Sequence, residues 1–295
     1  MNDPLRIPRI VSEQAAARST LSGVNIPAKT MAEHLLENKV DMTTAEKVTC
    51  IMVHYDSPRL AMTRTAVNNL LRDQSYRNLE LVIVNSTGRR ITNREHPSFR
   101  EYEVSPQDYS SVGSLKNFGI QQARGAWIAF TADDAHSHPH RLTLQMAHRV
   151  PGKCSLFSHV CKVDVRNSVV CIDQNPKGQA STILFPREHA GDFDPNLSID
   201  EDQDFLDRMF DEDQRILVTN DSSWFPGPCA LVEFWHGRNA KTREEFLKEY
   251  AEEKYLGVRN PGVTTDVLEY VQVALQKHKA DMSLNAGKET AAPNN

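Results

Sequence analysis

The sequence predicts an α/β fold in which a mostly parallel central sheet is flanked by helices. Two apolar runs rich in β-branched residues, 48–55 and 79–84, lack the polar alternation of half-exposed strands, so both are expected to be buried on two faces. Between them, residues 60–71 place apolar side chains mostly at helical spacing. Strand, helix and strand in this order make one parallel crossover unit, and such units are almost always right-handed.

A second helix and strand follow, and the strand ends in two adjacent carboxylates. Residues 113–125 indicate a short helix, with Ser114 as its N-cap and Gly125 just beyond its end. The apolar strand after it leads to Asp133 and Asp134. In open α/β sheets ligands bind beyond the carboxyl ends of the strands, and two aspartates there suit a hard divalent cation. The alternative is a polar turn in which one aspartate caps the next helix.

Four segments in this order resemble the nucleotide-binding half of family 2 glycosyltransferases, which have the GT-A (nucleotide-diphospho-sugar transferase) fold. They are residues 50–56, 70–84, 116–125 and the aspartate pair. The likeness continues through residues 193–205, where the acid pair Glu201-Asp202 opens a helix, and through residues 228–239, which are similar to the family's late strand ending in His-Gly-x-Asn.

The resemblance implies a division of the chain. A GT-A domain is expected over residues 48–239, with a donor-binding half at 48–142 and an acceptor half at 143–239. Outside it we expect an N-terminal extension over 1–47, C-terminal helices over 240–282 and a disordered tail over 283–295.

The resemblance to this family implies that the protein is an enzyme, a hexosyl- or pentosyltransferase that inverts the configuration at the anomeric carbon. Such an enzyme moves a sugar from a nucleotide-sugar donor to an acceptor hydroxyl with the help of Mn²⁺ or Mg²⁺. Asp134 matches the family's metal-binding aspartate, and His236 is placed to reach the diphosphate or to complete the metal site. The chain departs from the family at Ala132, where the motif's first aspartate is usual.

Donor contacts are implied for several further residues. Lys116 resembles a basic residue that meets the nucleotide, and Asn85 stands where the family has an acid that reads the base. The remaining expected donor-binding residues lie after the first strand or at the variable middle of the aspartate motif: His54, Tyr55, Asp56 and Asp133. A solvent-facing Tyr55 and a solvated Lys116 are the plainer alternatives.

The resemblance also implies a catalytic base. Asp202, with Glu201 beside it, matches the acid pair that commonly removes the acceptor proton. Without the family likeness, the acids at 200–204 would be explained as a helix start favoured by the helix dipole.

Composition narrows the remaining choices. The formal charge of −5 over 295 residues is not a polyanion-binding signature, and no apolar run or leader predicts a membrane span, so we expect a cytoplasmic protein. Its five scattered cysteines are expected to be mostly reduced thiols. The acceptor is left open between a glycan and a small molecule, and a homo-oligomer is possible.

Two rival classes stay open at this point. One is a non-catalytic relative that binds a nucleotide or a sugar. The other is a GT-A transferase acting on a hydroxylated base in nucleic acid, for which a local basic run provides a candidate surface: Arg89, Arg90, Arg94 and Arg100.

Overall fold

The structure of the chain is a computed structural model that describes residues 46–92, 96–164, 169–197, 199–218, 230–235, 255–257 and 276. Its larger sheet has seven strands in the order β10-β6-β9-β4-β1-β2-β3. These strands are β1 (Val48–His54), β2 (Leu79–Asn85), β3 (Phe99–Glu103), β4 (Trp127–Phe130), β6 (Cys154–Leu156), β9 (Leu184–Pro186) and β10 (Arg215–Leu217).

Most neighbours in this sheet run parallel. β1 is parallel to β2 and to β4, β2 is parallel to β3, and β6 is parallel to β10. Only β9 runs against its neighbours β4 and β6 among the described pairs. The predicted α/β fold with a mostly parallel, helix-flanked sheet is confirmed.

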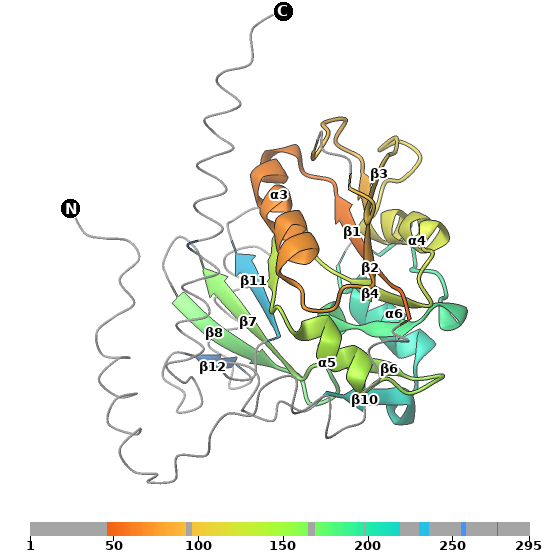
Figure 1. The fold of residues 1–295 in the computed structure, drawn as a ribbon, viewed down its shortest axis with the longest axis vertical. Coiled ribbons are helices and arrows are strands. Elements are labelled where there is room, and N and C mark those ends of the chain that lie inside the picture. The colour runs from red at the N-terminus through yellow and green to blue at the C-terminus, as the bar shows by residue number, and fades with distance from the viewer. Residues whose placement is uncertain are drawn as a thin grey trace, which may run out of the picture.

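Helices cover both faces of the sheet. The described helices are α3 (Leu60–Asn68), α4 (Val112–Gln122), α5 (Arg141–Ala147) and α6 (Glu201–Met209). Short turns of other helical types occur at Ser57–Arg59, Asn69–Asp73, Ala180–Thr182, Arg187–His189 and Glu212–Gln214. α3 and α4 lie on opposite sides of β1 and β2 (Figure 1).

The two faces of β1 explain its sequence. Cys50 and Met52 pack with α3 residues in one apolar cluster, whereas Ile51 packs with a phenylalanine-rich cluster on the other side. A strand covered on both sides has no solvent-facing positions, and each such side chain contributes about 1.5–3 kcal/mol when fully buried. Gly119 lets α4 lie close against β1, since a Cβ there would be 2.5 Å from a methyl of Ile51.

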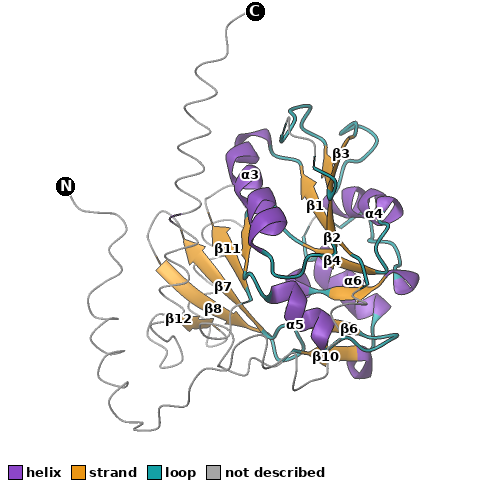
Figure 2. Cartoon of the chain, in the orientation of Figure 1, coloured by secondary structure: helices purple, strands orange, loops and turns teal. Residues whose placement is uncertain are grey.

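A second sheet lies beside the first (Figure 2). Its order is β12-β8-β7-β11-β5, with β5 (Ala135–Ser137), β7 (His159–Asp164), β8 (Val169–Gln174), β11 (Leu231–Trp235) and β12 (Tyr255–Gly257). β5 follows the aspartate pair directly and pairs with β11. The alternative that Asp133 or Asp134 caps the next helix is therefore wrong, because the chain forms a strand first and α5 begins only at Arg141.

The ends of the chain are described only in part. Of the N-terminal extension at 1–47, residues 46–47 are described, and the predicted tail at 283–295 lies outside the described residues. Within the region 240–282, for which C-terminal helices are expected, residues 255–257 form β12, an edge strand antiparallel to β8, and residue 276 is helical. The rest of that region lies outside the described residues, so its helices stay a prediction.

Two smaller predictions concern the start of α4 and the state of the cysteines. The N-cap of α4 is Ser111 and not Ser114: the two serines form a reciprocal capping box, in which Ser114 occupies the third helical position.

Cys50 and Cys154 are buried free thiols, and burial raises the pKa of each to about 12. Cys161 is disulfide-bonded and is an exception among cysteines that were expected to be mostly reduced. None of the helices described in the chain is both long and apolar enough to span a bilayer.

Candidate functional site

A cavity of about 340 Å³ opens beyond the carboxyl ends of β1 and β4. Parallel strands bring their ends to one edge of the sheet, so residues far apart in sequence meet there. The charged side chains in its lining come from the turn after β1, from α4, from the aspartate pair and from the start of α6. The lining consists of Val53, Tyr55, Arg59, Val112, Lys116, Phe130, Thr131, Ala132, Asp133, Asp134, Ser181, Glu201 and Asp202.

Asp133 is fixed by a buried set of partners, which we call the Asp133 cluster: Asp133, Arg59, His54 and Thr63. Its carboxylate pairs with the Arg59 guanidinium and accepts a hydrogen bond from Nδ1 of His54 at 2.8 Å and another from Thr63 Oγ1 at 3.3 Å. Only 1% of Asp133 is exposed. With its lone pairs used inside the protein, the carboxylate acts as a structural anchor of the turn after β1.

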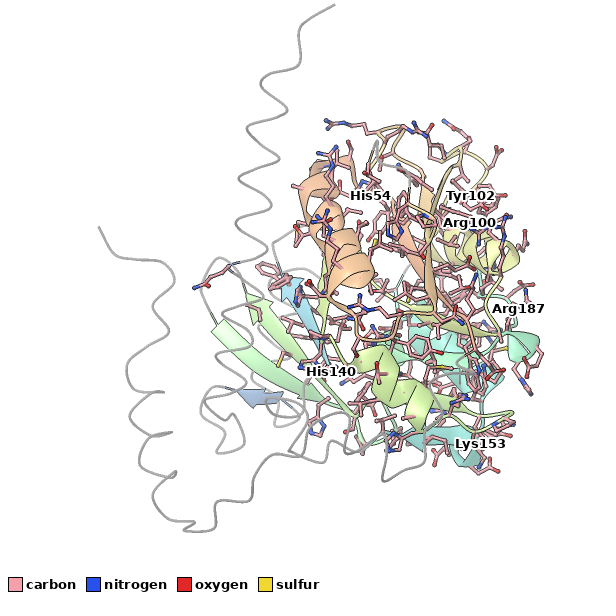
Figure 3. The ribbon with its side chains drawn as sticks, viewed as in Figure 1. His54, Arg100, Tyr102, His140, Lys153 and Arg187 are labelled. Carbon is pink, nitrogen blue, oxygen red and sulfur yellow. The ribbon has the colours of Figure 1, made fainter. Side chains whose placement is uncertain are left out.

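His54 stands behind the cavity and does not line it. Its ring is fully buried, and it lies among the packed side chains beside α3 (Figure 3). Burial, together with the nearby charge of Arg59, lowers the pKa of His54 to about 4, so the ring is neutral at pH 7. Its predicted contact with a nucleotide base stays a prediction, and in the structure the ring orients Asp133.

Asp134 faces the cavity more directly. Its Oδ2 lies 3.5 Å from Nη2 of Arg59, and its backbone oxygen accepts from the N–H of Phe234 on β11. Asp134 is thereby held at the point where the two sheets meet.

The lining fits a divalent cation held weakly. Two cationic side chains face four carboxylates in it, a formal charge of −2, which favours an added cation. Asp134 supplies one carboxylate, and Mg²⁺ is often held by one or two carboxylates with water and substrate phosphate oxygens. The described residues contain no group of three or more metal-binding side chains. His236 lies outside the described residues, so the metal prediction stays a prediction.

The second ion-paired group is the Lys116 cluster: Lys116, Glu201 and Asp202. The Lys116 ammonium donates to Glu201 Oε1 at 2.9 Å and to Asp202 Oδ1 at 2.6 Å. Burial opposes its charge, but the two carboxylates outweigh burial and raise the pKa of Lys116 above its usual value. The Lys116 and Asp202 side chains are 9% and 32% exposed, so the base candidate is the more open partner.

Tyr55 and Asn85 have different surroundings. Tyr55 lines the cavity, is 41% exposed, and its ring lies 5.1 Å from the Arg59 guanidinium carbon. The Asn85 amide donates to Glu101 Oε1 at 2.8 Å, and its oxygen accepts from the N–H of Thr87 at 2.9 Å. Asn85 is buried and, like Asp56, is not in the lining. Tyr55 thus lines the cavity together with the predicted catalytic and metal-binding carboxylates. Asn85, which was predicted to contact the nucleotide base, instead hydrogen-bonds within the loop that follows β2 and to β3.

Sequence patterns did not single out Arg59. It ends the short helical turn Ser57–Arg59, where Pro58 presets the backbone and the Arg59 N–H bonds to the Asp56 carbonyl at 2.8 Å. The available signal was an arginine in the loop after the first buried strand, close to the expected ligand edge. Its partner Asp133 could not be inferred from that spacing.

The basic run past β2 does not form one cationic surface. Arg100 is paired with Glu80 at 3.0 Å and donates to the Gln122 carbonyl, and it lies beside Tyr102 on β3 (Figure 3). Arg89 and Arg90 are exposed, and Arg94 lies outside the described residues. At least one arginine of this run, Arg100, therefore has a structural role and is not available to follow a phosphate backbone.

No family model and no curated protein matches the chain. Among solved structures, it is similar to S. aureus TarS 1–349 in complex with UDP-GlcNAc (13% identity, 66% of this chain, 60% of that chain, TM-score 0.49). It is also similar to the mannosyltransferase PcManGT from Pyrobaculum calidifontis in complex with GDP-Man and Mn²⁺ (15%, 86%, 78%, TM-score 0.47). A third is GalNAc-T7 with UDP, GalNAc and Mn²⁺ (10%, 72%, 49%, TM-score 0.48).

These matches fall in the GT-A glycosyltransferase class that the sequence resembles. The chain spans about three fifths of the length of the first solved structures it matches. With identities of 15% or less and TM-scores below 0.5, the likenesses place no ligand and assign no residue in this chain.

Proposed function

We propose that this chain is an inverting glycosyltransferase that moves a sugar from a nucleotide-sugar donor to an acceptor hydroxyl. The observation that carries the proposal is the convergence of Asp134, Glu201 and Asp202 in one cavity at the carboxyl edge of the sheet. The motif resemblance over residues 48–239 supports the same class.

In this proposal Asp202 is the general base. Its carboxylate takes the proton of the acceptor hydroxyl while that oxygen bonds to the anomeric carbon from the face opposite the diphosphate. The bond from the anomeric carbon to the diphosphate oxygen breaks, and the nucleoside diphosphate leaves with the electron pair. The partial exposure of the Asp202 side chain gives an acceptor access to it.

The donor would occupy the Asp134 side of the cavity. Asp134 would hold Mn²⁺ or Mg²⁺, a cation that offsets the charge developing on the leaving diphosphate. Tyr55, exposed over the Arg59 guanidinium, offers a flat apolar face for the nucleotide base. The cavity's own formal charge of −2 explains why a diphosphate would require the cation.

The test begins with binding. Thermal-shift screening of UDP-, GDP-, ADP-, CMP- and dTDP-sugars with and without Mn²⁺ should identify a donor whose stabilisation of the protein increases with the logarithm of its concentration. Transfer to candidate glycans and small-molecule acceptors is then measured.

Asp202→Asn should lower kcat about a hundred- to ten-thousand-fold with little change in donor affinity. The matched control is Asp204→Asn, because Asp204 sits on the same helix but pairs with Arg208 outside the cavity. Its rate should stay within about tenfold of the wild type. Equal losses in the two variants would contradict the base assignment.

Other outcomes would assign the rival classes. Donor binding without transfer to any acceptor would indicate a non-catalytic relative. Transfer to hydroxylated DNA, with affinity falling steeply as salt rises, would indicate a nucleic-acid acceptor. The pairing of Arg100 with Glu80 makes us prefer a glycan or small molecule.

A further inference from the structure

Lys116 is a residue of α4 whose side chain contacts the first turn of α6. Its side chain is nine-tenths buried, and its ammonium lies over two aromatic rings, 5.0 Å from the centroid of Phe193 and 5.8 Å from that of Phe130. An ammonium has three donors, and two of them are engaged by Glu201 and Asp202. Little of this side chain is left to meet a ligand.

The first turn of α6 lacks an ordinary cap. Its N-cap residue, Asp200, has a left-handed backbone with φ of 61° and makes no side-chain capping hydrogen bond. Glu201 and Asp202 are adjacent in that turn, so their side chains leave the helix in different directions. A single cation that binds both fixes the rotation of the turn about its axis.

Asn117, the next residue of α4, fixes the backbone segment that leads to the first turn of α6. Asn117 donates to the Phe193 carbonyl at 3.0 Å and accepts from the Phe193 N–H at 2.7 Å. Earlier in α4, Gly113 leaves no spare room, since a Cβ there would be 3.0 Å from the Asp194 carbonyl. Consecutive side chains of one helix therefore dock the segment that carries the proposed base.

We propose that Lys116 is a positioning residue that aims Asp202 at the acceptor, and not a ligand of the donor as the family resemblance implied. This role rests on the proposed glycosyl transfer. Lys116 acts through the carboxylate it holds, and Asn117 supports it by fixing the backbone before α6.

The deciding variant is Lys116→Met, which keeps the length and the packing on the rings. Misaiming a base by about 1 Å typically costs about a hundredfold, so kcat should fall between about tenfold and a hundredfold. The dissociation constant of the donor, measured by calorimetry, should stay within about threefold of the wild type. Loss of a charged donor contact would instead raise it about tenfold or more and overturn the proposal.

Rescue by a conservative variant separates aiming from general damage. The Lys116 ammonium donates to Asp202 at 2.6 Å, and Lys116→Arg keeps the charge and can donate to both acids. The kcat of Lys116→Arg should therefore stay within about tenfold of the wild type. A Lys116→Arg variant as slow as Lys116→Met would show that the cation does not aim Asp202 and would overturn the proposal.

The charge of the cavity needs its own control. Lys116→Met alone makes the lining more negative, whereas Lys116→Met/Glu201→Gln restores its formal charge of −2. Donor affinity should be that of the wild type in the double variant, and kcat should stay reduced. If Lys116→Met does not fold, the same measurements on Asn117→Ala decide, with reduced kcat and unchanged donor affinity expected.

The two proposals fail differently. A wild-type protein that neither binds a nucleotide sugar nor transfers one would overturn the proposed function, and this inference with it. An active wild type whose donor affinity collapses in Lys116→Met would overturn the positioning role alone.

Discussion

The Asp133 cluster and the Lys116 cluster both join a cationic side chain to carboxylates, but they differ in their access to water. Asp133 is 1% exposed and is contacted by Arg59, His54 and Thr63 together. In the Lys116 cluster the Asp202 side chain is 32% exposed and has the cavity in front of it. The first arrangement suits a fixed framework, and the second suits a group that exchanges a proton with a substrate.

The largest expected effect is on stability, in the Asp133 cluster. Asp133→Asn keeps the shape of the side chain but leaves the buried Arg59 guanidinium with only the Asp134 carboxylate, 3.5 Å away, as a counter-charge, which should cost about 3 kcal/mol of unfolding free energy. Urea unfolding of the wild type and of Asp133→Asn measures this difference in unfolding free energy. Asp202→Asn, at the more exposed cluster, should cost about 1 kcal/mol or less. Similar costs at the two sites would remove the distinction drawn between the clusters.

A smaller effect is expected at Asp134, which lies between the two clusters in exposure. A donor at a hundred times its dissociation constant stabilises a protein by about 2.7 kcal/mol. Asp134→Ala should abolish the Mn²⁺-dependent part of that stabilisation, because the variant loses the proposed metal carboxylate, and it should keep its fold without donor. Mn²⁺-dependent stabilisation that survives in Asp134→Ala would exclude the metal assignment.

The smallest expected effect concerns a buried ring near α5. Burial, followed by the charges of His140 and His136, lowers the pKa of His138 to about 3, and its Nδ1 accepts from the His140 N–H. The unfolded chain therefore binds this proton first as pH falls, so stability is full above pH 6.5 and is lost toward pH 3. Between pH 6.5 and 5 the loss should be about 1–2 kcal/mol.

Unfolding free energies at several pH values test this, with His138→Asn as the matched variant, since its oxygen can replace Nδ1 as acceptor. The variant should show a shallower pH dependence than the wild type. An identical slope would mean that other groups, such as the buried His54, carry the acid sensitivity.

The secondary-structure elements that could be predicted from the sequence are those with long hydrophobic patterns. The runs that became β1 and β2 are seven residues long and mostly apolar, so their burial on both faces could be predicted, and with it the edge where Asp134 lies. β5 has three residues and no period, and its identity comes from pairing with β11. Sequence alone carries little information about such a strand.

Site residues followed a similar rule. Glu201 and Asp202 were found because a motif and a helix start coincide there, and the structure brings both to the cavity. Arg59 and the inward turn of Asn85 depend on partners that are distant in the sequence or fixed by loop geometry, namely Asp133 and Glu101. Side-chain direction at a strand end is decided by those partners, and residue type alone does not reveal it.

The close seating of α4 on β1 makes a residue with no side chain part of the proposed chemistry. Gly119 lies one turn after Lys116 on the same helix, and the missing methyl group lets α4 approach Ile51 as closely as it does. Because a helix moves as a rigid rod, its distance from the sheet also sets how far the Lys116 ammonium reaches toward α6. The alignment of the reacting groups is thus adjusted by backbone spacing, and a position with no functional group of its own can tune the rate.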